Sequence, residues 1–196
     1  MTRLLGIVGS PRKGGNTEII MREILRAGEQ EGAETELIRL VDFTLKPCNG
    51  CQTCFETKKC SVKDDAEEIF GKMMEADGVI VGSPVYFFNV SAQTKMFMDR
   101  VGYLNVARKR EALRNKIGGA MAVAGRQGLT QASSEILLFL ANARMIITGP
   151  FVTVLASAKG DAAKDKYGIG EARELGKSMV RVAKATAELR KRAKAN

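Results

Sequence analysis

The sequence predicts an α/β domain in which five parallel strands form one doubly wound sheet with helices on both of its faces. Short apolar segments alternate along the chain with longer segments whose apolar residues recur at helical spacing, and this alternation is typical of a parallel sheet. The chain of 196 residues is long enough for one hydrophobic core and contains no internal repeat, low-complexity segment or linker. We therefore expect residues 1–196 to form a single domain.

Five segments are predicted to be strands because each is an apolar or alternating run bounded by turn residues. The first is continuously apolar, as expected of a strand buried on both faces, and the last is interrupted near Gly149 and Pro150. The five segments are residues 4–9, 34–40, 78–82, 117–124 and 145–155.

Five segments are predicted to be helices because their apolar residues lie on one helical face. Asn16 is expected to cap the first helix and Ser91 the third, since both side chains accept hydrogen bonds from free backbone N–H groups. The helices are expected over residues 16–31, 66–76, 91–101, 130–143 and from 170 to about 195. The apolar stripes of the first and last helices consist of Ile19, Ile20, Ile24 and Ala27, and of Leu175, Met179, Val182 and Leu189.

The order of these segments indicates how the sheet is wound. Parallel strands joined through helices require right-handed crossovers. Five such strands suit a flavodoxin-like sheet of strand order 2-1-3-4-5, which binds its ligands at the carboxyl ends of the strands. Functional residues are therefore expected in the loops that follow the strands.

The composition excludes several functional classes. No apolar run reaches the roughly 18 residues of a membrane span, so we expect no membrane association and a cytoplasmic location. The net charge is +9, but Lys and Arg are spread along the chain without a nucleic-acid-binding motif, so no nucleic-acid partner is expected. The absence of histidine excludes a Ser-His-Asp hydrolase and a His-ligated zinc site. We expect a bound cofactor to carry the chemistry instead.

Residues 9–17, Gly-Ser-Pro-Arg-Lys-Gly-Gly-Asn-Thr, form a candidate phosphate-binding loop between the first strand and the first helix. A helix N-terminus offers unpaired N–H groups and the positive end of the macrodipole, both of which favour a phosphate. Ser10, Asn16 and Thr17 add hydrogen-bond donors, and Arg12 adds positive charge. The patterns typical of ATP and dinucleotide sites are absent, which favours a mononucleotide. An ordinary strand-to-helix turn is the alternative interpretation.

The motif G-S-P-R-x-x-G-N-T resembles the phosphate loop of the flavodoxin-like NAD(P)H-dependent FMN reductase family, and residues 82–95 are similar to the second flavin loop of that family. The resemblance implies FMN as the cofactor. Residues 86–88 are all aromatic and would give a flat apolar ring a stacking surface, although we expect at least one of them only to pack, in the core or at a subunit interface. The residues that would line the flavin by resemblance are Pro84, Val85, Tyr86, Phe87 and Asn89.

Residues 125–130 are a candidate third flavin loop because they follow the fourth strand. Gly125 and Gly128 would let this loop close over the pyrimidine end of the ring. Arg126 departs from the small residues associated with this loop, which leaves its contacts open. Glycine-rich turns are common after strands, so a plain turn is the alternative.

All four cysteines lie in one C-x2-C-x2-C-x5-C run, at Cys48, Cys51, Cys54 and Cys60, within an irregular loop of about residues 41–63. Four thiolates in one loop can ligate a [4Fe-4S] cluster, and the first three have the spacing of bacterial ferredoxins. Structural zinc, a disulfide and a dithiol switch at Cys51 and Cys54 are the alternatives. Within the FMN reductase family, this run resembles the iron-sulfur flavoprotein branch.

These resemblances imply an oxidoreductase that passes electrons from a ferredoxin-like donor through a [4Fe-4S] cluster to FMN and on to oxygen, peroxide or a quinone. One alternative is an NAD(P)H-dependent FMN or quinone reductase with a zinc-bound or vestigial cysteine run, and another is a zinc-stabilised module that binds RNA or protein. The resemblance also implies a homodimer or homotetramer. Basic side chains are candidate contacts for an acidic donor, or else solvated surface, and these are Lys58, Lys59, Arg108, Lys109 and Arg110.

Overall fold

The sheet has the strand order that the sequence predicts. In the computed structural model, which describes residues 1–190, parallel strands follow one another in the order β2-β1-β3-β5, and β6 and β7 both pair with β5 as a fifth strand in two pieces. The interruption between these two pieces lies at Gly149 and Pro150, as predicted, and the peptide bond that joins these residues is cis. The strands are β1 (Thr2–Val8), β2 (Ala33–Arg39), β3 (Gly78–Tyr86), β5 (Ile117–Ala124), β6 (Ile146–Ile147) and β7 (Val152–Leu155).

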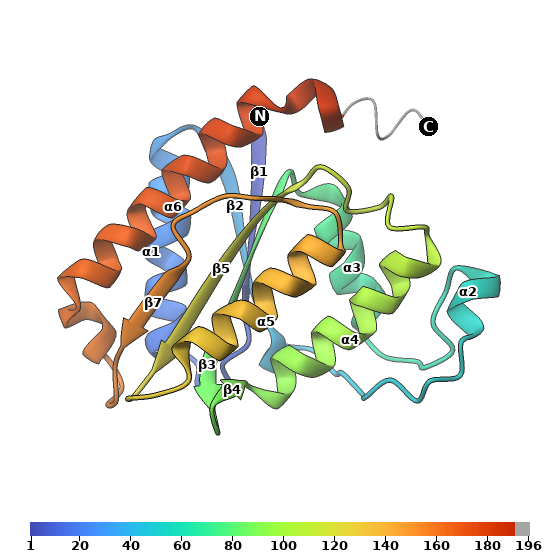
Figure 1. Ribbon diagram of the computed structural model, residues 1–196, viewed down its shortest axis with the longest axis horizontal. Helices are drawn as coiled ribbons and strands as arrows, with labels where there is room; N and C mark the ends of the chain where they lie inside the picture. Colours follow the sequence, from blue (N-terminus) through green and yellow to red (C-terminus); the bar gives the residue numbers. More distant parts are fainter. Residues whose placement is uncertain (191–196) are drawn as a thin grey trace.

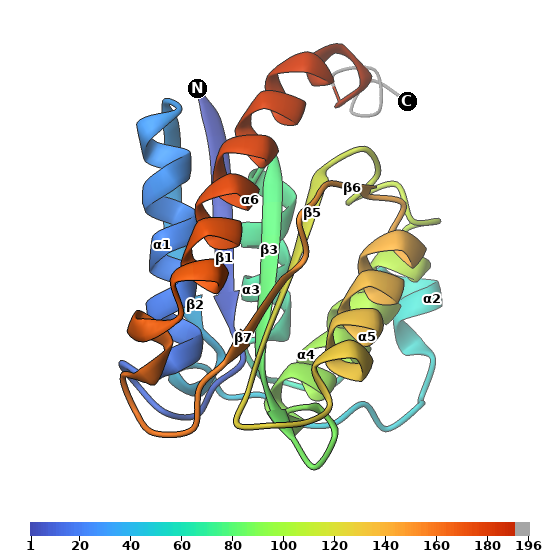
Figure 2. The same cartoon turned by 60° about the vertical axis from the view of Figure 1, so that its left-hand side comes forward.

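Helices cover both faces of this sheet, as Figures 1 and 2 show. Helices α1 (Asn16–Gln30) and α6 (Lys166–Ala185) lie together on one face, and their apolar residues form one core with β1, β3, β5 and β7. Helices α3 (Ala66–Glu75), α4 (Ala92–Ala107) and α5 (Leu129–Asn142) cover the other face over a second core. No helix within residues 1–190 is both long and apolar enough to cross a bilayer.

Several elements have boundaries that differ from those the sequence indicates. Strand β3 continues to Tyr86 and turns back into the two-residue strand β4 (Asn89–Val90), so part of the expected second flavin loop is a hairpin. Helix α4 runs six residues beyond 101, and α6 begins four residues before 170. Short helices not predicted are η1 (Leu40–Asp42), α2 (Thr53–Thr57) and η2 (Asp161–Lys164).

The end of the chain differs from the predicted helix. Helix α6 ends at Ala185 and, after a turn at Thr186, residues 187–190 are helical again, but Leu189 is 47% exposed rather than part of the buried stripe. Leu175 and Met179 are fully buried, as predicted. Residues 191–195 of the predicted helix lie outside the described residues.

The two predicted helix caps differ in outcome. Ser91 caps α4 as predicted, because its Oγ accepts a hydrogen bond from the Thr94 N–H at 3.3 Å. Asn16 does not cap α1, and that prediction is wrong: the N-cap position is Gly15, and Asn16 is the first helical residue. Its side chain has long-range partners instead.

Candidate functional site

The loops predicted to bind a cofactor meet at the carboxyl edge of the sheet, where the arrows of β3, β5 and β7 end in Figure 1. The Gly9 N–H donates to the Gly82 carbonyl at 2.8 Å, and the Ser91 hydroxyl donates to the Gly9 carbonyl at 2.6 Å. These bonds join the phosphate loop to β3 and to the start of α4. The first two predicted loops are therefore neighbours.

Close packing explains why the first residue of the phosphate loop, Gly9, is a glycine. A Cβ atom at Gly9 would lie 1.8 Å from Thr94 Oγ1, which belongs to a buried hydroxyl network with Ser83 and Ser91. Ser10 and Thr17 are buried beside this position, whereas Arg12 is exposed. Ser10 Oγ accepts a hydrogen bond from the Arg12 N–H at 3.2 Å, which curls the loop before α1.

The Asn16 side chain joins the phosphate loop to the segment between β7 and α6. Its Nδ2 donates to the Ala158 carbonyl at 2.8 Å, and its Oδ1 accepts from Gly160 N–H at 2.8 Å and Ala162 N–H at 3.3 Å. These contacts occupy both polar atoms of the amide. Any phosphate contact predicted for Asn16 is therefore left to the second Nδ2 hydrogen and to the backbone N–H.

Replacement of Asn16 by alanine is expected to destabilise the chain by about 1–2 kcal/mol, because three hydrogen bonds to the 158–162 segment are lost. Urea denaturation of the wild type and of Asn16→Ala gives this value. Asn16→Asp retains the two accepted bonds, so its free energy of unfolding is expected to lie between those of the wild type and Asn16→Ala. Equal midpoints for all three proteins would contradict a bridging role.

Glu18 is a buried carboxylate in the first turn of α1 that the sequence analysis did not identify. It accepts hydrogen bonds from the Gly14 N–H at 2.8 Å and from Arg22 Nη2 at 2.6 Å. Burial opposes its ionisation, but these bonds and the charge of Arg39 hold the pKa of Glu18 below its usual value. A fixed negative charge therefore stands beside the candidate phosphate loop.

Arg39 extends this ionic group toward the cysteine loop. Its Nη1 lies 3.7 Å from Glu18 Oε2, and its Nε donates to Asp42 Oδ2 at 2.6 Å. Lys13 of the phosphate loop also pairs with Asp42. Three ion pairs thus tie the start of the cysteine loop to the phosphate loop and to α1. Of their members, Glu18, Arg39 and Asp42 lie outside the motifs.

The aromatic hairpin projects away from the core. Its two turn residues, Phe87 and Phe88, have positive φ angles of 47° and 72°, which bulky side chains rarely adopt. Tyr86 is 42%, Phe87 98% and Phe88 56% exposed. Within residues 1–190 none of the three fills the core, because the hairpin turn directs all three outward. The expectation that at least one aromatic only packs, in the core or at a subunit interface, stays a prediction for the interface.

The third predicted loop packs directly on this hairpin. Gly128, with φ of 87°, is so close to it that a Cβ would lie 2.7 Å from Val85 Cγ1 and 2.8 Å from the Phe88 backbone. The Gly125 carbonyl accepts a hydrogen bond from the Ser157 hydroxyl at 3.2 Å, and Arg126 is exposed. The structure therefore brings the second and third loops together, and the segment after β7 joins them.

All four cysteines line one cavity of about 320 Å³. Cys54 and Cys60 are partly buried against the α3–α4 core, whereas Cys48 and Cys51 are exposed, and all four are free thiols. Among residues 1–190, no three Cys, Asp or Glu side chains form a group suited to a single metal ion. What the four sulfur atoms share is the cavity, whose lining includes none of the predicted flavin residues.

The sulfur atoms have unlike electrostatic surroundings. Hydrogen bonds from Ser61 and Thr53 lower the pKa of Cys51 to about 7, and its Sγ lies 3.0 Å from the Ser61 hydroxyl. Burial, together with the neighbouring Cys60, raises the pKa of Cys54. Cys51 thus forms a thiolate more readily than Cys54 does.

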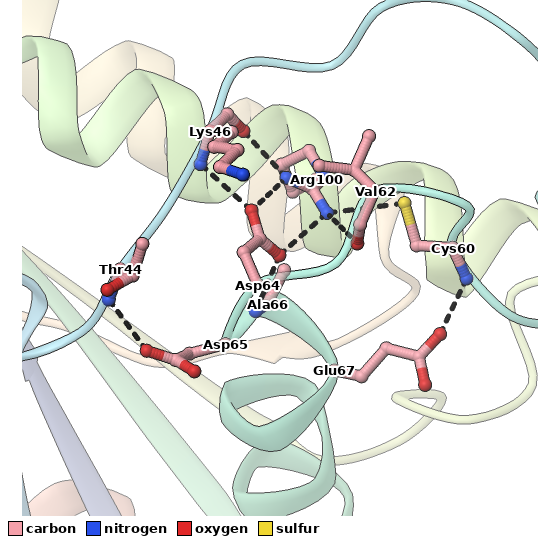
Figure 3. Close-up of polar contacts among 9 residues, drawn as sticks. All are labelled: Thr44, Lys46, Cys60, Val62, Asp64, Asp65, Ala66, Glu67 and Arg100. Carbon is pink, nitrogen blue, oxygen red and sulfur yellow. Dashed lines mark hydrogen bonds and ion pairs between the residues drawn. The ribbon is translucent and has the colours of Figure 1, made fainter.

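A buried ion pair holds both ends of the cysteine loop (Figure 3). Asp64 and Arg100 have side chains that are 0% and 1% exposed, and two guanidinium nitrogens donate to the two carboxylate oxygens. Asp64 also accepts from the Lys46 N–H at 2.8 Å, before the first cysteine, and from the Ala66 N–H at 3.1 Å, after the last. Hydrogen bonds from Arg100 and these N–H groups outweigh burial and keep the pKa of Asp64 below its usual value.

Arg100 reaches one of the cysteines directly. Its Nη2 donates to Cys60 Sγ at 3.2 Å, and the Cys60 N–H donates to the Glu67 carboxylate (Figure 3). Helix α4 therefore reaches both predicted sites: its N-cap Ser91 bonds to the phosphate loop, and the helix carries Arg100 nine residues later. At 1.5 Å per residue, this interval is about 14 Å along the helix axis.

Comparisons with known proteins agree with this geometry. A family model described as NADPH-dependent FMN reductase matches residues 2–159. An iron-sulfur flavoprotein of Methanocaldococcus jannaschii is 46% identical over 93% of this chain and 97% of its own length. An iron-sulfur flavoprotein of Archaeoglobus fulgidus is 33% identical over 96% of this chain and 98% of its own. A solved archaeal flavodoxin, 18% identical, superposes with a TM-score of 0.64 over 93% of this chain and 99% of its own, which supports the flavodoxin-like fold.

Proposed function

Since the chain belongs to the NADPH-dependent FMN reductase family and is an FMN-dependent oxidoreductase of the iron-sulfur flavoprotein type, we propose that its four cysteines hold one [4Fe-4S] cluster that exchanges single electrons with FMN. The observation that carries this proposal is the cavity that all four cysteines line. A four-iron cluster takes four thiolate ligands, which is the full set available here. The donor set therefore fits the cluster.

The residues at the carboxyl edge of the sheet also fit FMN. The α1 N-terminus, with Ser10, Arg12 and Thr17, suits the phosphate group. The exposed aromatic hairpin offers stacking surface to the ring, with Pro84, Val85 and the third loop beneath it. When bound, FMN supplies two-electron and one-electron redox chemistry, and the cluster supplies one-electron transfer. The role of the chain is to bind both groups and fix their separation.

A ferredoxin-like protein is the proposed electron donor, and oxygen, peroxide or a quinone the proposed acceptor. A one-electron donor suits a cluster that accepts electrons singly. The second candidate is direct reduction by NADPH, favoured by the description of the matching family. We also propose a cytoplasmic location, because four free thiols need a reducing compartment to stay available as ligands.

Anaerobic purification followed by assays of iron, labile sulfide, zinc and flavin tests the cofactors. We expect about four iron and four sulfide per chain together with one FMN. Flavin with zinc but without sulfide would overturn the cluster. Stopped-flow reduction by ferredoxin and by NADPH then separates the two candidate donors. Faster reduction of the flavin by NADPH than by ferredoxin would overturn the ferredoxin route.

Charge steering of the donor can be tested at the cysteine loop. Lys58 and Lys59 are exposed beside the cysteines, whereas Arg108 is partly buried over the Phe70 ring. Reversing both lysines to glutamate is expected to slow reduction by an acidic ferredoxin roughly tenfold at low salt, with a smaller effect at high salt. The matched control replaces Lys166 and Lys177 of α6, on the opposite face of the sheet, by glutamate. Equal rates for the two double variants would contradict steering at this loop.

Homodimers or homotetramers are part of the same proposal. Large apolar side chains are exposed at the hairpin and along the fifth strand, and a second copy would cover them. The residues concerned are Phe87, Phe88, Phe151 and Leu155. Light scattering of the purified protein measures the mass, and a monomer at micromolar concentration would contradict this assembly.

A further inference from the structure

Arg100 is a buried cation in the wall of the cysteine cavity. The residue is 2% exposed, and its Nη2 donates to Cys60 Sγ at 3.2 Å (Figure 3). Its Nε is also buried and has no hydrogen-bond partner among residues 1–190. It is the arginine in the lining of this cavity.

Asp64 fixes the position of this guanidinium. The two side chains make a two-point contact, and Arg100 Nη1 also donates to the Lys46 carbonyl at 2.6 Å. Because Asp64 in turn binds the backbone at Lys46 and Ala66, the guanidinium is held against the loop from both sides. A planar, multidentate group is needed for this, since a lysine ammonium could not reach the sulfur and both carboxylate oxygens with the same geometry.

A fixed positive charge and an N–H donor at a ligand sulfur both stabilise the reduced form of the cluster. Reduction adds one negative charge to the cluster, and part of that charge lies on the cysteine sulfur atoms. Hydrogen bonds to sulfur and local burial are the main means by which a protein sets a cluster potential. Asp64 balances much of the guanidinium charge, so the N–H bond to the Cys60 sulfur carries most of the effect, and a hydrogen bond is stronger in a buried setting than in water.

We propose that Arg100 is a positioning residue that raises the reduction potential of the cluster by holding its guanidinium on the Cys60 sulfur, with Asp64 as the group that fixes it. The proposal rests on the proposed function, because it requires a cluster on these cysteines. In the step concerned, the cluster gains one electron and a one-electron donor loses one. No covalent bond forms or breaks, and the guanidinium keeps its protons.

Redox titration of the loaded protein, monitored by electron paramagnetic resonance, tests the proposal. Arg100→Gln is expected to shift the equilibrium between oxidised and reduced cluster at least tenfold toward the oxidised form, which is about 59 mV for a one-electron couple. Arg100→Lys keeps the charge and is expected to shift it less. Glu68→Gln, an exposed change on α3, is the control and should leave the potential unchanged. A purely structural role would lower iron content without moving the potential of the clusters that remain, and would overturn the proposal.

A second measurement needs no substitution. Wild-type protein labelled with guanidinium-¹⁵N arginine is expected to show ¹⁵N coupling to the reduced cluster in pulsed electron paramagnetic resonance, even if Arg100→Gln fails to fold. Absence of that coupling in a protein with full iron and sulfide would overturn the role of Arg100. Absence of iron and sulfide from the wild type would instead overturn the proposed function, so the two failures are distinguishable.

Discussion

Replacement of Cys54 by alanine is expected to abolish cluster binding and leave FMN binding intact. Cys54 is the cysteine of helix α2, where it packs against the α3–α4 core. In the proposed cluster Cys54 is a ligand, and loss of a ligand would remove a bond to iron itself, so the effect should exceed the roughly 10- to 100-fold loss of affinity that follows changes around a metal site. Iron and labile sulfide per chain, together with the flavin absorbance, measure both effects on one sample.

The control for Cys54→Ala is Glu56→Ala, an exposed change on the same short helix. It should retain iron, sulfide and FMN at wild-type levels. FMN should persist in both variants because the residues predicted to line the flavin do not line the cysteine cavity. Full iron and sulfide in Cys54→Ala would show that the cluster has another fourth ligand and would contradict ligation by all four cysteines.

Replacement of Asp64 by asparagine is expected to lower the free energy of unfolding by about 3–5 kcal/mol, because removal of one member of a buried ion pair leaves the other charge uncompensated. An asparagine amide would also direct a donor group at the Arg100 guanidinium. Urea denaturation should show a lower midpoint with an unchanged slope.

Asp65→Asn is the matched control for this substitution. Asp65 is the adjacent carboxylate and accepts one hydrogen bond, from the Thr44 N–H at 2.6 Å. Asparagine retains an acceptor there, so the cost should be about 1 kcal/mol or less. Equal losses in the two variants would contradict a special role for the buried pair.

The lowered pKa of Asp64 also indicates how acid should change the stability of the fold. Its pKa in the folded chain is below that in the unfolded chain, which is about 3.9. As pH falls, Asp64 therefore takes up its proton first in the unfolded chain. The stabilisation that ionised Asp64 gives is complete above about pH 4 and is lost as pH falls through the pKa of Asp64 in the folded chain. Denaturation midpoints of wild type and Asp64→Asn should converge at low pH, and a constant difference down to about pH 2 would contradict this assignment.

Local patterns in the sequence predicted those parts of the structure that are determined by residues close together along the chain. The alternation of strands and helices gave the strand order, and the cysteine spacing gave a common cavity. The end of β3 was not predicted because Pro84 and the aromatic residues are typical of a loop, yet Pro84 pairs with Val123 of β5. Strand pairing overrides local preference there.

Long-range partners explain the remaining differences. The Asn16 side chain was expected to cap its own helix, but its partners lie more than 140 positions away. Asp64 and Arg100 are 36 positions apart, and neither belongs to a motif. A charged residue is common on any helix, so only its burial distinguishes Arg100, and burial of a charge cannot be read from local pattern.

Helix α4 has a consequence for how such proteins can vary. Its first turn is bonded to the Gly9 carbonyl, and Arg100 holds the cysteine loop two and a half turns later. With FMN and the cluster bound as proposed, the interval between them would be set by this rigid helix and not by the length of the chain that joins the cysteines to β2. Insertions or deletions in that connecting segment could accumulate while the gap for electron transfer stayed constant.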